Sequence, residues 1–197
     1  MGGKRLRRVV KLGGSLLLQP QLVSGLRTWL ADQTPASNLM IAGGGQLIDA
    51  VRELDGIYRS DSPWVHWQCV ELLRTTIGWL SQQLPEMQFI TTPAQFETLR
   101  SPELPNGNYL LQVDSFYNRG VDPILPEDWR TTTDAIAGYL AMRLNADELV
   151  LLKSCDTDPT LSIEQLAERG IVDEALPLIA PELPPIRIVN FASLIES

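Results

Sequence analysis

Two of the three lysines in this chain stand at the ends of apolar segments that have the composition of buried β-strands. Lys11 lies in "VVKLGGSLL" (Val9–Leu17), directly before two glycines and a serine, and Lys153 ends the run "LVLLK". Burying an ammonium group without a partner is costly. We therefore expect each of these lysines to face a carboxylate or a phosphate.

Glycine clusters follow the first two expected strands, at Gly13-Gly14-Ser15 and at Gly43–Gly45. In α/β proteins, ligands collect where the carboxyl ends of parallel strands meet helix N-termini. Backbone amides favour anions there, and glycine lets a phosphate approach closely. Each cluster therefore predicts a phosphate site, with tight turns alone as the alternative. Neither cluster has the residue order of a Walker P-loop or of a Rossmann dinucleotide fingerprint.

A third segment, "DWRTTTDAIAGYLAMRLNADELVLLKSCD" (Asp128–Asp156), runs from hydroxyl groups and an acid into an apolar helix and then into the strand of Lys153. Thr132, Thr133 and Asp134 stand at the expected helix start, where a helix cap is the alternative interpretation.

Short apolar runs alternate with longer stretches of helical period, which predicts a layered α/β fold with a mostly parallel sheet. The expected strands are 6–12, 38–42, 87–90, 109–113, 148–152 and 186–189. The expected helices are 21–32, 46–58, 64–84, 133–144 and 162–169. The proline-rich pieces 93–105 and 177–185 are expected to be surface connections. Residues 1–197 form one domain in this interpretation, with a soft seam near 100–108.

The net charge of −8 excludes a protein that coats nucleic acid or an anionic membrane. Cys69 and Cys155 have neither metal-site nor disulfide-framework spacing, so packing roles in a reducing, cytoplasmic setting are expected. The basic start, which includes Lys4, is followed by an apolar run too short and too interrupted for a signal peptide or a membrane anchor.

Taken in order, the strand-Lys-x-Gly-Gly-Ser segment, the second glycine cluster, Thr-Thr-Asp and "NADELVLLKS" resemble the amino acid kinase superfamily, over roughly Val9 to Asp173. That superfamily includes aspartate, acetylglutamate and uridylate kinases. "HW" at His66, "DW" at Asp128, "LLKS" at Leu151–Ser154, "GIVD" at Gly170–Asp173 and the short length are similar to its small branch of methanofuran biosynthesis, which phosphorylates an (aminomethyl)furanmethyl phosphate to its diphosphate.

The resemblance implies a three-layer αβα sandwich with about eight strands, an acceptor lobe (1–105) and a nucleotide lobe (106–197) that uses ATP with Mg²⁺. Lys11, Asp134 and Lys153 would be catalytic, with Asp134 holding the lysines. No protein ligand set for a metal is expected. The implied phosphate and ATP contacts are Gly13, Gly14, Ser15, Thr132, Thr133, Ser154 and Asp156, and the implied acceptor contacts are Gly43, Gly44, Gly45, Arg52, Arg59 and His66.

Two segments depart from the family pattern. The late Gly-Gly-Met-x-x-Lys segment has no lysine here, its counterpart being "ERGIVDEAL", and Asp-Gly-Val is replaced by Asp156-Thr157-Asp158-Pro159. Either Lys153 supplies the missing charge, or the protein is weakly active or inactive. The sequence therefore leaves open a kinase for another small acceptor (an amino acid, a nucleoside monophosphate or isopentenyl phosphate) and a non-catalytic nucleotide-binding protein.

Several side chains carry two interpretations. His66 is the only histidine, and packing competes with acceptor contact alongside Asp61 and Trp67. Arg52 and Arg59 either bind an acceptor phosphate or lie on a solvated helix face. The tryptophans at 64, 67 and 79 are expected in a core or a subunit interface. The family resemblance implies a homo-oligomer, a dimer by default, and the helix 64–84 is the expected interface.

Overall fold

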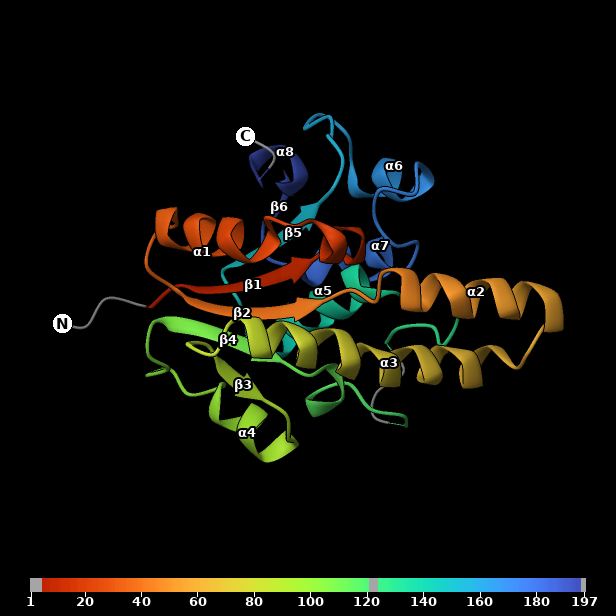
Figure 1. Ribbon diagram of the computed structural model, residues 1–197, viewed down its shortest axis with the longest axis horizontal. Coiled ribbons are helices and arrows are strands. Elements are labelled where there is room, and N and C mark those ends of the chain that lie inside the picture. Colours follow the sequence, from red (N-terminus) through yellow and green to blue (C-terminus); the bar gives the residue numbers. More distant parts are fainter. Residues whose placement is uncertain (1–4, 121–123, 196–197) are drawn as a thin grey trace.

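The computed structural model describes residues 5–120 and 124–195, and Lys4 of the basic tail lies outside them. These residues form one all-parallel sheet of six strands in the order β3-β4-β2-β1-β5-β6. The strands are β1 (Arg7–Leu12), β2 (Ser37–Ala42), β3 (Gln88–Ile90), β4 (Gly107–Leu111), β5 (Glu148–Lys153) and β6 (Ile186–Asn190). Helices cover both faces of the sheet, which confirms the expected layered α/β architecture (Figure 1).

Two helical layers enclose the sheet because its strands are apolar on both faces, as parallel strands require. The helices are α1 (Leu22–Asp32), α2 (Gln46–Tyr58), α3 (Ser62–Gln83), α4 (Pro93–Thr98), α5 (Thr133–Arg143), α6 (Ile163–Glu168), α7 (Leu176–Ile179) and α8 (Phe191–Ile195). Val10 points to the layer of α1, α8 and the end of α3, whereas Val9 points to the layer of α5 and α7. Side chains alternate along a strand, so Lys11 faces α5.

The sheet has six strands in the described residues, not the eight that the family resemblance implies. The six apolar runs of the sequence account for all of them. The long connections that follow β4 and β5 form turns and short helices instead, and they contain Pro126, Pro159 and Pro177. Proline cannot donate to a strand ladder, so these connections are poorly suited to additional central strands.

Smaller differences concern the proline-rich connections and one strand. The segment 93–105 contains α4, which is fixed by a capping box between Thr92 and Gln95. The segment 177–185 contains most of α7. The fourth strand ends at Leu111 rather than at Val113, because Val113 begins a short 3₁₀ helix. β4 pairs with both β2 and β3, so the expected seam near 100–108 does not interrupt the sheet.

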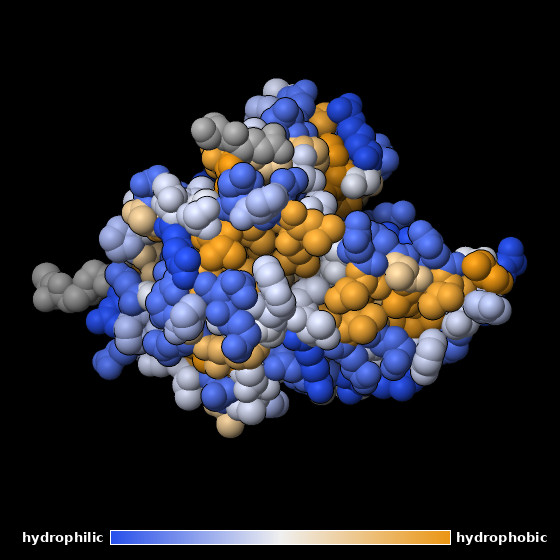
Figure 2. Space-filling view, viewed as in Figure 1, coloured by the Kyte–Doolittle hydropathy of each residue, from blue (hydrophilic) through white to orange (hydrophobic). Residues whose placement is uncertain are grey.

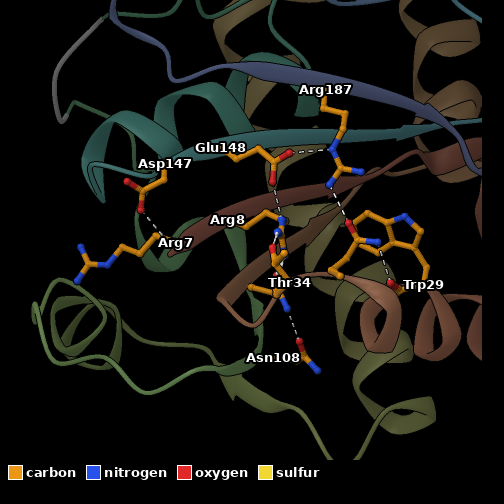
Figure 3. Close-up of polar contacts among 10 residues, drawn as sticks. Arg7, Arg8, Trp29, Thr34, Asn108, Asp147, Glu148 and Arg187 are labelled. Atoms are coloured by element: carbon orange, nitrogen blue, oxygen red, sulfur yellow. Dashed lines mark hydrogen bonds and ion pairs between the residues drawn. The ribbon is translucent and has the colours of Figure 1, made fainter. Parts of the chain in front are cut away.

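Polar side chains at the amino ends of the strands form a network (Figure 3). The glycine clusters follow the carboxyl ends of β1 and β2, at the opposite end of the sheet. Arg8, which is only 2% exposed, donates from Nε to Glu148 Oε2 at 2.6 Å and from Nη1 to Asn38 Oδ1 at 2.9 Å. Arg187 Nε donates to the other oxygen of Glu148 at 2.7 Å. Asn38 Nδ2 in turn donates to Asn108 Oδ1 at 2.8 Å. The network therefore joins β1, β2, β4, β5 and β6.

We expect Glu148→Ala to lower the free energy of unfolding by about 2–3 kcal/mol, because Arg8 would remain buried without its carboxylate. Arg187→Ala should cost less than about 1 kcal/mol, since the Arg187 side chain is 38% exposed. Urea unfolding of both variants measures the two losses. Equal losses would show that Glu148 acts at the surface and not as the partner of a buried charge.

Candidate active site

The two lysines converge on one acid. Lys11 Nζ lies 2.8 Å from Asp134 Oδ1, and Lys153 Nζ donates to Asp134 Oδ2. β1 and β5 are neighbours in the sheet, and α5 begins at Thr133, so the carboxyl ends of both strands meet the helix start that carries Asp134. Oδ1 has no hydrogen-bond partner among the described residues, so its contact with Lys11 is an ion pair. The structure thus brings together the three residues predicted to be catalytic.

Burial and the neighbouring charges have opposite effects on the pKa of Asp134. Asp134 is 2% exposed, and burial by itself would raise its pKa. The charges of Lys11 and Lys153 outweigh that effect and lower the pKa of Asp134. Burial lowers the pKa of Lys153, the charge of Lys11 acts in the same direction, and Asp134 opposes both. With both lysines protonated, the three groups carry one net positive charge, which is suited to holding an anion.

The two glycine clusters pack directly against each other. A Cβ on Gly14 would lie 2.3 Å from Gly45 N, and a Cβ on Gly43 would lie 2.7 Å from Gly14 N. Gly45 also has a φ of 56°, in the region that favours glycine. The backbone of these two turns therefore requires glycine, as the turn interpretation expects. The N–H groups of Gly14, Gly44 and Gly45 nevertheless have no hydrogen-bond partner among the described residues. Gly14 begins a 3₁₀ turn, and Gly44 and Gly45 directly precede α2.

A cavity of about 470 Å³ lies between the glycine clusters, α2, α3 and the segment before α5. Of the predicted site residues it is lined by Lys11, Gly14, Ser15, Gly43, Gly44, Gly45, Arg52, His66, Thr132 and Thr133. Its remaining walls include apolar side chains of α2 and α3, such as Ile48 and Val65. Lys11, Asp134 and Lys153 are called the charged triad below. Of these three residues, Lys11 alone lines the cavity.

The other predicted residues lie outside that cavity. Asp134 contacts Lys11 and Lys153 contacts Asp134, but neither Asp134 nor Lys153 lines the cavity. Gly13 N donates to Leu152 O at 2.8 Å. Ser154 Oγ is 2.8 Å from Ser15 Oγ, which joins the ends of β5 and β1. Asp156 Oδ1 accepts a hydrogen bond of 2.8 Å from Asn190. Arg59 ends α2 as an exposed residue with left-handed backbone, away from the cavity.

His66 lies in a cluster of aromatic side chains at the cavity wall. Its Nε2 is 3.0 Å from Tyr117 Oη. Burial lowers the pKa of His66. Trp67 stacks on Tyr117 with ring centroids 5.0 Å apart. The packing interpretation of His66 and Trp67 is therefore well founded, while His66 still lines the cavity.

The remaining candidates have surface or packing positions. Asp61 caps α3 by accepting a hydrogen bond from Trp64 N at 3.0 Å. Trp64 and Trp79 are exposed on α3. Cys69 lines the cavity, and burial raises the pKa of its thiol to about 11, so it is a neutral thiol at physiological pH. Cys155 is exposed.

Asp173 is a site residue that the sequence analysis did not single out. Its Oδ2 accepts hydrogen bonds from Thr132 N at 2.9 Å and from Ala135 N at 2.8 Å, and its Oδ1 accepts from the Thr132 hydroxyl. The acid therefore caps the N-terminus of α5 from a distant segment. Its signal in the sequence was the acid of "GIVD", which was used only for the family resemblance.

The pH dependence of stability should report on Asp173. Burial raises the pKa of its carboxyl from 3.8 to about 6, the charge of Asp134 acts in the same direction, and Lys11 and the hydrogen bonds from Thr132 and Ala135 oppose it. An acid with a raised pKa stabilises the folded state at low pH and loses that contribution as pH rises through the folded-state value.

Relative to Asp173→Asn, the wild type should therefore lose unfolding free energy between pH 4 and pH 6, with a slope of at most about 1.4 kcal/mol per pH unit. Urea unfolding of both proteins at pH 4, 5, 6 and 7 measures the difference. A difference that stays constant over this range contradicts the prediction.

The carboxylates of this site do not form a magnesium ligand set. Asp134 faces two lysines with its two oxygens, and Asp173 is occupied by the start of α5. No group of three or more potential metal ligands occurs within residues 5–120 and 124–195. Lys11 and the glycines at 14 and 43–45 do fit phosphate groups, because they line one cavity.

Solved structures of kinases superpose on almost the whole chain. A uridylate kinase from Archaeoglobus fulgidus is 16% identical with a TM-score of 0.60, over 96% of this chain and 94% of that one. A UMP kinase from Bacillus anthracis is 15% identical with a TM-score of 0.65, over 94% and 87%. The chain has the amino acid kinase fold. A UMP kinase from Ureaplasma parvum agrees, at 13% identity and a TM-score of 0.63 over 94% and 90%.

The amino acid kinase fold is shown by these structures, whereas the acceptor is not, because identities this low establish architecture alone. No protein-family model and no curated protein matches the chain. None of the three structures is a kinase of methanofuran biosynthesis, so that branch stays a prediction. Among the described residues, no helix has both the length and the apolar character needed to cross a membrane.

Proposed function

We propose that this protein is an ATP-dependent phosphotransferase that acts on a small acceptor. The observation that carries the proposal is the convergence of Lys11 and Lys153 on the buried Asp134, with Lys11 also lining a cavity that the glycine clusters line. Phosphoryl transfer asks little covalent chemistry of a protein, and it depends on alignment and on positive groups around the migrating charge. The kinase fold is consistent with this activity.

In the proposed reaction, an oxygen of the acceptor forms a bond to the γ-phosphorus of ATP, and the bond from that phosphorus to the β,γ-bridging oxygen breaks. ADP leaves with the electron pair of that bond. Lys11 stabilises the oxygens of the transferred group, and the N–H groups of Gly14, Gly44 and Gly45 add preorganised donors. Asp134 is a positioning residue that holds both ammonium groups. Lys153 supplies the second positive charge in place of the late family lysine.

For the acceptor, we propose a phosphate monoester of the furan-amine type, as in the methanofuran branch. The composition of the cavity wall supports this choice, because it includes Arg52, Asp49 and Asp128 beside apolar residues such as Ile48 and Val65. An acceptor with an anionic end, a cationic end and a small ring matches that set. UMP is the second candidate, because the superposed structures include UMP kinases.

The test is ADP release from ATP by the purified protein with each of five acceptors: (aminomethyl)furanmethyl phosphate, UMP, isopentenyl phosphate, aspartate and acetylglutamate. Acceptor-dependent ADP release with the furan-amine phosphate as the best substrate supports both parts of the proposal. If another acceptor is the best substrate, the proposed acceptor is wrong and the proposed phosphotransferase activity still holds. ATP binding by calorimetry, without turnover of any acceptor, supports instead a non-catalytic nucleotide-binding protein.

We further propose that a homodimer forms through the arm, defined as α2 with the first half of α3. The arm projects from the sheet in Figure 1, and Figure 2 shows apolar surface over it. Ile57 is 71% exposed and Tyr58 75% exposed on α2, and Trp64 is 52% exposed at the start of α3. Exposed apolar area of this kind is typical of an interface.

Sedimentation analysis tests the dimer. The wild type should sediment as a dimer at micromolar concentration and Ile57→Glu as a monomer. Leu178→Glu is the matched control, since Leu178 is an exposed leucine on α7, away from the arm. A monomeric wild type contradicts the proposal.

A further inference from the structure

The segment Asp128–Thr132, called the strap below, forms one wall of the cavity. Asp128, Trp129, Thr131 and Thr132 all line the cavity, and the strap leads directly into the helix start that carries Asp134. Its position therefore affects the shape of the acceptor cavity and the approach to the charged triad.

One end of the strap is tied to the protein core. Thr132 N donates to Asp173 at 2.9 Å, and the carbonyl of Arg130 accepts from Ala175 N at 2.9 Å. These contacts fix the backbone of the strap on the side of α5 and α7.

The side chain of Trp129 is held from the opposite side, by α2. Trp129 Nε1 donates to Asp55 Oδ2 at 2.7 Å, and Asp55 Oδ1 accepts from Ser60 N at 2.8 Å. This hydrogen bond is the main cause that lowers the pKa of Asp55, so the carboxyl is ionised at neutral pH. The guanidinium of Arg52 lies 4.7 Å from the centroid of the Trp129 ring. Among the described residues that line the cavity, Arg52 and Trp129 are included but Asp55 is not.

We propose that Asp55 is a positioning residue for the acceptor, acting through Trp129. Its carboxylate holds the indole ring as the outer wall of the cavity, and the ring in turn supports the guanidinium of Arg52 by a cation–π contact. Arg52 and Asp49 both line the cavity and form an ion pair of 3.3 Å, and in this proposal the guanidinium exchanges that partner for an anionic acceptor. This inference rests on the proposed phosphotransferase activity, and it assigns the acceptor to the anionic class.

The experiment compares steady-state kinetics of wild type, Asp55→Ala, Asp55→Asn and Trp129→Phe with the acceptor that the wild type phosphorylates best. Asp55→Ala and Trp129→Phe should each raise the KM for the acceptor about tenfold, as expected for one lost charge-assisted hydrogen bond. kcat and the KM for ATP should change less than about twofold. Asp55→Asn keeps an acceptor oxygen for the indole N–H and should restore most of the affinity.

Two further variants make the test specific. The double variant Asp55→Ala with Trp129→Phe should have the same KM as either single variant, because both remove one and the same contact. Glu53→Ala is the matched control, as Glu53 is an exposed acid on the same helix that does not line the cavity. Multiplied effects in the double variant, or an unchanged KM in Asp55→Ala, overturn the inference.

Hydrogen exchange separates this inference from the proposed activity. The N–H of Thr131 donates to Asp128 O within the strap, so its exchange reports on whether the strap stays ordered. Asp55→Ala should speed exchange in the strap at least about fivefold and leave β1 unchanged. If the wild type phosphorylates no acceptor, the proposed function fails, and the exchange result still decides the role of Asp55. Unchanged exchange in that variant overturns it.

Discussion

Replacing Asp134 by Asn should lower the free energy of unfolding by about 3–5 kcal/mol, the range found when one partner of a buried ion pair is removed. Two ammonium groups contact this one carboxylate, and Lys11 and Asp134 are both buried. The variant would leave two positive charges close together without a counterion. No other single substitution in the site is expected to destabilise the fold as much.

Urea unfolding measures this loss of stability, and two comparison variants test whether the uncompensated lysine charges cause it. Asp134→Asn combined with Lys153→Met should be more stable than Asp134→Asn alone, because one of the two uncompensated charges is gone. Asp49→Asn should change stability by less than about 0.5 kcal/mol, since the Asp49 side chain is 61% exposed. A loss below about 1 kcal/mol for Asp134→Asn would show that the lysines do not depend on it.

The largest expected effect on activity belongs to Lys11→Met, which should lower kcat about 1000-fold, the scale of a lost charge that stabilises transferred phosphoryl oxygens. Lys11 is the member of the charged triad that reaches the cavity. The folded state should persist, because Asp134 keeps Lys153 as its partner and methionine has a similar length.

ADP release with the best acceptor measures this effect, and a thermal unfolding curve confirms that the variant is folded. Arg59→Met is the matched control, because Arg59 is exposed at the end of α2 and lies outside the cavity. Its kcat should stay within about twofold of the wild type. A folded Lys11→Met variant with kcat within tenfold of the wild type would refute the catalytic role of Lys11.

The sequence by itself determined the strands, most of the helices and the positions of the two lysines. Apolar runs such as "LVLLK" can be buried only as strands or helices, and their length together with the helical period of the intervening stretches decides between the two. Lysines at the carboxyl ends of such strands, beside glycines, predict an anion site because parallel strands end at one edge of the sheet. The fold class follows from local features of this kind, whereas the convergence of Lys11, Asp134 and Lys153 is implied only by the family resemblance.

The tertiary structure decided what depends on contacts between distant parts of the chain. β5 lies beside β1 although more than 130 residues separate them, and this placement brings Lys153 to the carboxylate that Lys11 also contacts. Contacts between distant residues also decide the number of strands, the capping of α5 by Asp173 and the support of Trp129 by Asp55. Periodicity and motifs report on neighbours along the chain, whereas strand order and hydrogen bonds between remote side chains are fixed only when the layers pack.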